Sequence, residues 1–295
     1  MATSIITQST RLDLRYCAEN KPPDTDFAIP GLVVGTVGVI VAAGSTGKSY
    51  WLTEAAAGVC SKGADKALLN LGIQNHGRAL ILNAEDPQPI LWERWHAICS
   101  HLSQEAREEV YEKLTIESLM GVMPRTDIMN DDWLASVIDA AQGCRLVVID
   151  TLIRWHSAEE NDNGAMSAVL SRFEAVCRAT GAAVLLAHHV GKSMSRDGRQ
   201  SDQTATRGAA AITDNSRWQG WMQSMGAQDA EKYGICEDER WRYVQTGSSK
   251  NNYTQGGGDC WLERKEGGVL IPANLKESSL KEHGQVGKKR GFKHD

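Results

Sequence analysis

The stretch with the clearest chemistry is residues 37–49, which read VGVIVAAGSTGKS. An apolar run ends in a glycine-rich turn, Gly44-Ser45-Thr46-Gly47, and Lys48-Ser49 then opens a segment with helical spacing. The backbone N–H groups of such a turn, together with the positive end of the following helix, bind anionic phosphate. In this pattern the lysine reaches the β- and γ-phosphates and the serine hydroxyl binds Mg²⁺. We therefore predict a phosphate-binding loop, although Ala42 stands where the pattern has its first glycine. The alternative is a turn that binds nothing.

Three more polar side chains stand where apolar runs end: Glu85, Asp150 and His189. In open α/β sheets, ligands bind outside the carboxyl ends of the strands. Asp150 follows the run 146–149 and has the expected form of the carboxylate that holds Mg²⁺ in the second phosphate-site motif. Each of the three also has a plainer alternative: a capped turn for Asp150, a solvated acid for Glu85 and a buried imidazole for His189.

The general base must come from another strand, because Thr151 occupies the position after Asp150 where many such sites carry glutamate. Glu85 is the candidate, within reach of an attacking water, and Asp86 is the fallback. We expect His189 to contact the γ-phosphate.

Phosphoryl transfer also requires positive charge on the developing oxygens, which an arginine of a neighbouring subunit can supply. Arg207 and Arg217 both follow the His189 motif and are the candidates, with a surface ion pair as the alternative.

The periodicity predicts alternating strands and helices, which favour a mostly parallel sheet covered on both faces. We expect strands at 37–41, 78–83, 144–150 and 182–187, helices at 50–60, 90–99, 103–114, 129–143 and 166–180, and late antiparallel strands at 240–246 and 260–266. Residues 1–24 are interpreted as a flexible N-terminal arm, 25–272 as the core and 273–295 as a flexible basic tail.

The composition limits the partners of the protein. The formal net charge is −5, so a nucleic acid would have to be bound by a local patch or a central channel. Residues 191–206 carry Lys192, Arg196 and Arg199 and are the candidate contact for single-stranded DNA, with a solvated loop as the alternative. We find no run long enough for a membrane span, no secretory signal and no CxxC pair, and expect a cytoplasmic protein.

The motifs together resemble those of RecA-like P-loop ATPases and, more narrowly, the RepA family of hexameric replicative DNA helicases of broad-host-range plasmids. The resemblance covers roughly residues 25–272 and rests on segments spread along the chain. They are 30–38, 47–49, 84–87, 149–152 with Arg154 and His156, 186–189, 214–218, 249–250, 252–253 and 267–270.

The resemblance implies a RecA-like fold, ATP and Mg²⁺ as cofactors, and a six-membered ring that threads one DNA strand. It implies that Lys48 and Ser49 bind phosphate and metal, that Glu85 is the base, that Asp150 is the metal-linked acid and that His189 senses the γ-phosphate. It makes Arg217 the finger that reaches the adjacent subunit and Arg264 a candidate for a second one. The residues it places around the nucleotide are Gly44, Ser45, Thr46, Gly47, Tyr50, Arg94 and Arg264.

Three hypotheses remain open on the sequence alone. The first is an ATP-driven, ring-forming DNA helicase. The second is a RecA-like ATPase that binds a DNA strand without unwinding a duplex. The third is a regulatory ATPase without a nucleic-acid partner, which the net acidity favours slightly.

Overall fold

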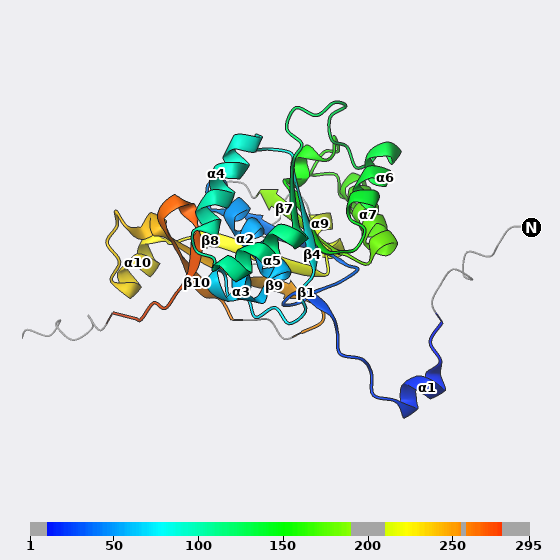
Figure 1. The fold of residues 1–295 in the computed structure, drawn as a ribbon, viewed down its shortest axis with the longest axis horizontal. Coiled ribbons are helices and arrows are strands. Elements are labelled where there is room, and N and C mark those ends of the chain that lie inside the picture. The colour runs from blue at the N-terminus through cyan, green and yellow to red at the C-terminus, as the bar shows by residue number, and fades with distance from the viewer. Residues whose placement is uncertain (1–10, 190–209, 255–257, 279–295) are drawn as a thin grey trace, which may run out of the picture.

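Apolar strands of the chain assemble into a mixed sheet with helices on both faces (Figure 1). The computed structural model describes residues 11–189, 210–254 and 258–278. Within these residues the sheet has nine strands in the order β11-β10-β9-β8-β3-β7-β6-β4-β5, and a separate hairpin pairs β1 with β2. The run β8-β3-β7-β6-β4-β5 is parallel, whereas β9, β10 and β11 pair antiparallel. The predicted fold class is confirmed.

The strands are β1 (Phe27–Ile29), β2 (Leu32–Val33), β3 (Val37–Ala42), β4 (Arg78–Asn83), β5 (Leu114–Ser118), β6 (Cys144–Asp150), β7 (Ala183–His189), β8 (Trp218–Ser224), β9 (Tyr243–Asn251), β10 (Cys260–Arg264) and β11 (Leu270–Ala273). The α-helices are α1 (Leu14–Glu19), α2 (Lys48–Cys60), α3 (Lys62–Ala67), α4 (Gln88–Cys99), α5 (Gln104–Lys113), α6 (Asp131–Ala140), α7 (Asn163–Thr180), α9 (Ala210–Asn215) and α10 (Ala227–Tyr233). Short 3₁₀ turns lie at Leu152–Arg154, Arg240–Arg242 and Glu266–Gly268.

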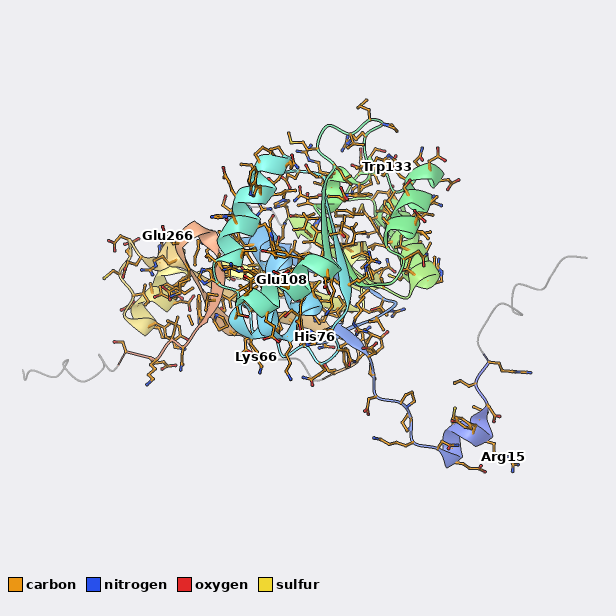
Figure 2. All side chains as sticks on the ribbon, viewed as in Figure 1. Arg15, Lys66, His76, Glu108, Trp133 and Glu266 are labelled. Atoms are coloured by element: carbon orange, nitrogen blue, oxygen red, sulfur yellow. The ribbon has the colours of Figure 1, made fainter. Side chains whose placement is uncertain are left out.

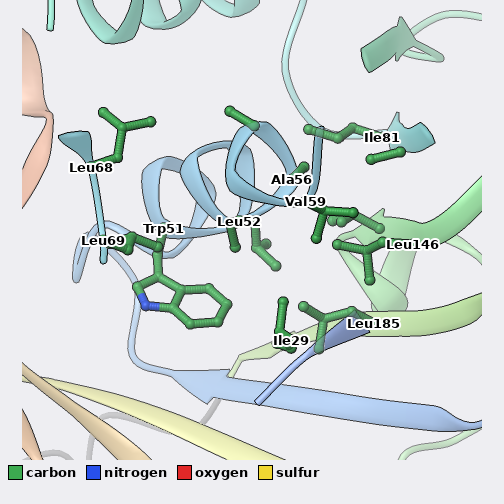
Figure 3. Packing of buried hydrophobic residues seen from close by; sticks show 14 of the residues in the cluster. Ile29, Trp51, Leu52, Ala56, Val59, Leu68, Leu69, Ile81, Leu146 and Leu185 are labelled. Carbon is green, nitrogen blue, oxygen red and sulfur yellow. The ribbon is translucent and has the colours of Figure 1, made fainter. Parts of the chain in front are cut away.

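Each face of the sheet is covered by its own set of helices, because successive strand residues point to opposite faces. Helices α2 to α5 pack on one face, and Figure 3 shows Leu52, Ala56 and Val59 of α2 lying against Leu146 and Leu185 of the strands. Helices α6, α7 and α9 cover the other face. The central strands are buried on both sides, which explains their continuous apolar sequences.

Several elements differ from the expected ones. The predicted helix at 129–143 is shorter, because the Asn130 side chain caps its first turn at Asp131. The segment 61–77 contains α3, and β5, β8 and α10 were not predicted. The arm 1–24 contains α1, whose residues are all exposed and which lies apart from the sheet (Figures 1 and 2).

Residues 191–206, which include Lys192, Arg196 and Arg199, lie outside the described residues, as do Arg207 and the tail beyond residue 278. The DNA-contact prediction and the flexibility of the tail therefore remain predictions. None of the described helices has both the length and the apolar character required to cross a bilayer.

A buried carboxyl group links α2 to the last strand and leads to a stability prediction. Glu54 is only 1% exposed, and one of its oxygens accepts the N–H of Leu270 at 2.9 Å. The other oxygen has no partner among the described residues. Burial raises the pKa of Glu54 well above its ordinary value. The folded state therefore holds a proton that the unfolded state releases, and stability is lost as the pH rises above the unfolded pKa.

We expect Glu54→Gln to raise the free energy of unfolding relative to the unchanged protein. The difference should widen with pH, by up to about 1.4 kcal/mol per unit, until it reaches the folded pKa. Denaturant unfolding at several pH values between 5 and 9 measures this difference. The exposed Glu112→Gln in α5 is the matched control and should show no such trend. A stability difference that does not change with pH would contradict the assignment.

Candidate nucleotide site

The turn between β3 and α2 has the backbone of a phosphate-binding loop. Gly47 has a φ of +99°, a left-handed conformation that favours glycine, and Ser45 has a φ of +66°. In the described structure no side chain caps the first turn of α2, so its N–H groups remain available to an anion. A Cβ added at Gly44 would meet nothing within 4 Å, so this part of the loop is open. The first-position Ala42 is the last residue of β3 and is fully buried.

Lys48 lies in the interior at the start of α2 and is only 4% exposed. Its Nζ donates a hydrogen bond to the main-chain oxygen of His188 at 3.1 Å. Burial lowers the pKa of Lys48 to about 8, against the opposing influence of Asp150 and Glu85. The lysine is therefore held at the carboxyl ends of β3, β6 and β7, with much less hydration than a surface lysine.

A pH prediction follows for nucleotide affinity. A triphosphate binds the charged form of Lys48, so binding above the pKa of about 8 must be accompanied by proton uptake. We expect the affinity for ATP to fall by up to about tenfold per pH unit above 8. The range 7.5–9.5 lies above that in which phosphate groups titrate. Calorimetry in two buffers of different ionisation enthalpy measures both affinity and proton uptake, and a constant affinity without proton uptake would contradict the prediction.

Asp150 ends β6 beside Ser49 and is 3% exposed. Burial raises its pKa, while the Ser49 hydroxyl and the Lys48 ammonium oppose this effect. One carboxylate oxygen accepts from Asn83 Nδ2 at 3.1 Å, and the other, Oδ1, has no hydrogen-bond partner among the described residues. An orphaned, buried carboxylate oxygen next to a serine hydroxyl fits the hard oxygen ligands that Mg²⁺ prefers.

Glu85 and Asp86 follow β4 but have different partners. Glu85 Oε2 accepts from Thr151 Oγ1 at 3.1 Å and lies 3.7 Å from His189 Nε2. Asp86 Oδ2 is 2.9 Å from Arg94 Nη2, in a largely buried ion pair. Because Asp86 is neutralised by Arg94, Glu85 is the better placed of the two to accept a proton from water. Burial, and then the charge of Lys48, lower the pKa of His189, which favours a neutral imidazole.

A second group of side chains surrounds the loop from the direction of the late strands. The Arg94 guanidinium lies 5.4 Å from the centroid of the Tyr50 ring, and the Tyr50 hydroxyl donates to the main-chain oxygen of Gly267. Arg264 of β10 donates to the main-chain oxygen of Thr46 at 3.1 Å. Tyr50, Arg94 and Arg264 thus gather around one end of the loop, and Arg264 lies on the loop of its own chain.

Arg217 stands at the opposite edge of the sheet. It immediately precedes β8, and its N–H donates to the main-chain oxygen of Val37, the first residue of β3. The phosphate loop follows the last residue of β3, and six strand residues span about 20 Å. The Arg217 side chain is exposed, and its charge lowers the pKa of the nearby Lys250, together with the larger effect of burial. Arg217 is therefore remote from the loop of its own chain.

Two residues that position the site were not singled out from the sequence. Asn83, buried at the end of β4, donates to Asp150 and accepts the N–H groups of Glu85 at 3.0 Å and Asp86 at 2.7 Å. Thr151 holds Glu85. A polar amide closing an apolar strand just before two acids was the available signal for Asn83. The partner of Thr151 becomes visible only when β4 and β6 pair.

Comparison with known proteins supports this interpretation of the loop. Residues 8–195 match the model of the AAA domain family AAA_25. Two solved structures share the fold at low identity. One is a solved ATPase domain, with 13% identity, a TM-score of 0.56, and coverage of 81% of this chain and 85% of that one.

The other is a DnaB-like replicative helicase described with its interactions with primase. It has 12% identity and a TM-score of 0.55, with coverage of 80% of this chain and 57% of that one. At these identities the likeness concerns the fold. The matched family spans more than half of the chain and includes the loop with Lys48 and the carboxylate Asp150. The chain therefore belongs to the AAA_25 family of AAA domains and is a P-loop ATPase.

Proposed function

We propose that this protein is an ATP-driven replicative DNA helicase, which assembles into a ring, most simply a hexamer, translocates on single-stranded DNA and unwinds duplex DNA. One observation carries the proposal: Arg217 lies at the edge of the sheet opposite the phosphate loop. An arginine in this place serves a nucleotide only if that nucleotide is bound by another subunit. Repeated head-to-tail contacts of this kind close into a ring. The two similar structures, an ATPase domain and a DnaB-like replicative helicase, support the same proposal.

In the proposed reaction, the backbone of the loop and Lys48 bind the phosphates of ATP, and Ser49 and Asp150 hold Mg²⁺. The metal ion supplies neutralising charge when bound. Glu85, fixed by Thr151, takes a proton from the water whose oxygen attacks the γ-phosphorus, and the bond to the β–γ bridging oxygen breaks. His189 is close enough to Glu85 to register the loss of the γ-phosphate. Arg217 of the adjacent subunit stabilises the charge on the transferring group.

An ATPase without unwinding activity is the alternative, and the net charge of −5 favours it. ATP turnover with and without single-stranded DNA, followed by unwinding of a forked duplex, separates the two. We expect DNA to stimulate turnover and the fork to be unwound only with ATP. Stimulation without unwinding would leave a DNA-binding ATPase, and no effect of DNA would leave a regulatory ATPase. Neutralising Lys192, Arg196 and Arg199 together should remove the stimulation if they contact the strand, while DNA-free turnover stays unchanged.

A further inference from the structure

A cavity of about 500 Å³ lies on the face of the sheet that carries α2, apart from the nucleotide site. Its walls come from the β1–β2 hairpin, the beginning of α2, residues 69–75 and strands β8 and β9. Small-molecule sites typically measure about 300–1,000 Å³. Among the described residues that line it, none belongs to the set placed around the phosphates, so the cavity is a separate feature.

Trp218 forms an aromatic floor on a bed of glycines. A Cβ added at Gly220 would lie 2.3 Å from Trp218 Cη2, and one at Gly31 would lie 2.9 Å from Cδ1. A Cβ at Gly38 would lie 3.2 Å from Cε3. Three positions without side chains thus allow the indole to lie against the sheet and the hairpin. A ring held in this way is preorganised for stacking.

Two indole N–H groups in this cavity have no partner. Trp51 is 3% exposed and Trp218 is 5% exposed, and neither Nε1 has a hydrogen-bond partner in the part of the chain that the structure describes. Figure 3 shows Trp51 beside Leu69 at the edge of the packed cluster. An unsatisfied buried donor costs about 1–3 kcal/mol, which an acceptor from a bound molecule would recover.

The charge of the lining narrows the ligand class. The described lining residues include the amides of Asn70, Gln74 and Asn75, and no carboxylate, lysine, arginine or histidine. A phosphate or carboxylate would therefore enter without a counter-charge. A plain hydrocarbon would leave both indole donors unsatisfied.

We propose that this cavity is a binding site for a neutral, planar heteroaromatic molecule of about purine size, rich in hydrogen-bond acceptors, which stacks on Trp218 and accepts from the indole N–H groups. The inference is independent of the proposed helicase function. Trp218 directly follows Arg217, and Trp51 lies one turn after Lys48. An occupant would therefore contact elements that carry both ends of the proposed catalytic apparatus.

Caffeine is a suitable probe, because it is neutral, planar and carries acceptors without N–H donors. We would label the full chain with 5-fluorotryptophan and assign the ¹⁹F resonances of Trp51 and Trp218 through Trp→Phe variants. We expect both resonances to shift saturably with caffeine, equally with and without saturating ADP, while those of the exposed Trp92 and Trp241 stay in place. A xanthine bearing a carboxylate should not bind.

Trp218→Phe removes one donor and should weaken binding about tenfold, the equivalent of one hydrogen bond of about 1.4 kcal/mol. The matched control, Trp92→Phe on the surface, should leave the affinity unchanged. If Trp218→Phe does not fold, Ser248→Phe, which places a ring in the cavity, should abolish both shifts. Shifts that do not saturate, that appear equally at Trp92 and Trp241, or that disappear with ADP would overturn the proposal. So would shifts of Trp51 and Trp218 caused, without caffeine, by removal of residues 1–24, because the arm would then be the occupant.

Discussion

Arg217→Ala is expected to lower ATP turnover by about 10³- to 10⁵-fold, equivalent to about 4–7 kcal/mol of transition-state stabilisation, while nucleotide affinity is retained. The reason is positional. Arg217 is exposed and separated from its own phosphate loop by the length of β3, so its proposed contact is with the transferring group on a neighbour, not with the bound ground state of its own chain. Single-turnover hydrolysis and equilibrium binding of a fluorescent ATP analogue measure the two quantities separately.

Arg178→Ala is the matched control. Arg178 is an exposed arginine of α7 that lies 3.8 Å from Glu174, and its removal should leave turnover unchanged. Normal hydrolysis by Arg217→Ala under conditions that support DNA-stimulated turnover would exclude the assigned role. A parallel loss of binding and turnover would instead indicate that the substitution disturbs the chain's own site.

Lys48→Ala is expected to remove both tight ATP binding and measurable turnover, with a loss of at least about 10²-fold in the chemical step. Lys48 is the buried cation between Asp150 and Glu85, and its removal leaves these two carboxylates without a counter-charge when the phosphates approach. The same substitution removes the desolvated ammonium, so the thermal midpoint should not collapse. Binding calorimetry and a thermal melt measure the two effects.

Lys62→Ala, at the exposed start of α3, is the control for the loss of a lysine and should behave like the unchanged protein. If Lys48→Ala retained ATP affinity within a factor of about two, the phosphate-loop assignment would lose its main electrostatic component.

The sequence was sufficient for those parts of the site that depend on local order. A glycine-rich turn before Lys48-Ser49, and the polar residues Glu85, Asp150 and His189 after apolar runs, each lie at the end of one strand. The parallel pairing of β3, β7, β6 and β4 then brings these ends to one edge. This convergence is a general property of open α/β sheets, so it was predictable without the structure.

The remaining features depend on pairings between distant segments. Arg264 reaches Thr46 only because β10 pairs with β9 and β9 with β8, which lies beside β3. The ion pair that sets Asp86 apart from Glu85 likewise needs α4 folded back over the end of β4. Neither contact has a signal in the local spacing.

Two strands were missed for identifiable reasons. β8 contains Gly220, which is ordinarily unfavourable inside a strand, and here it leaves the space that Trp218 fills. β5 follows α5 directly and is a half-buried edge strand, so its apolar alternation is weak. The helix α1 was missed because its residues bury nothing and its only cap is Asp13.

The most direct test of the central claim, that one ATP site is built from two subunits, is a mixing experiment. Arg217→Ala and Glu85→Gln proteins are combined in equal amounts before ATP, Mg²⁺ and DNA are added. Interfaces that pair an intact Glu85 with an intact Arg217 should form at random in about a quarter of positions, restoring about that fraction of turnover. Turnover that stays at the sum of the two inactive proteins, although they assemble together, would contradict the shared site.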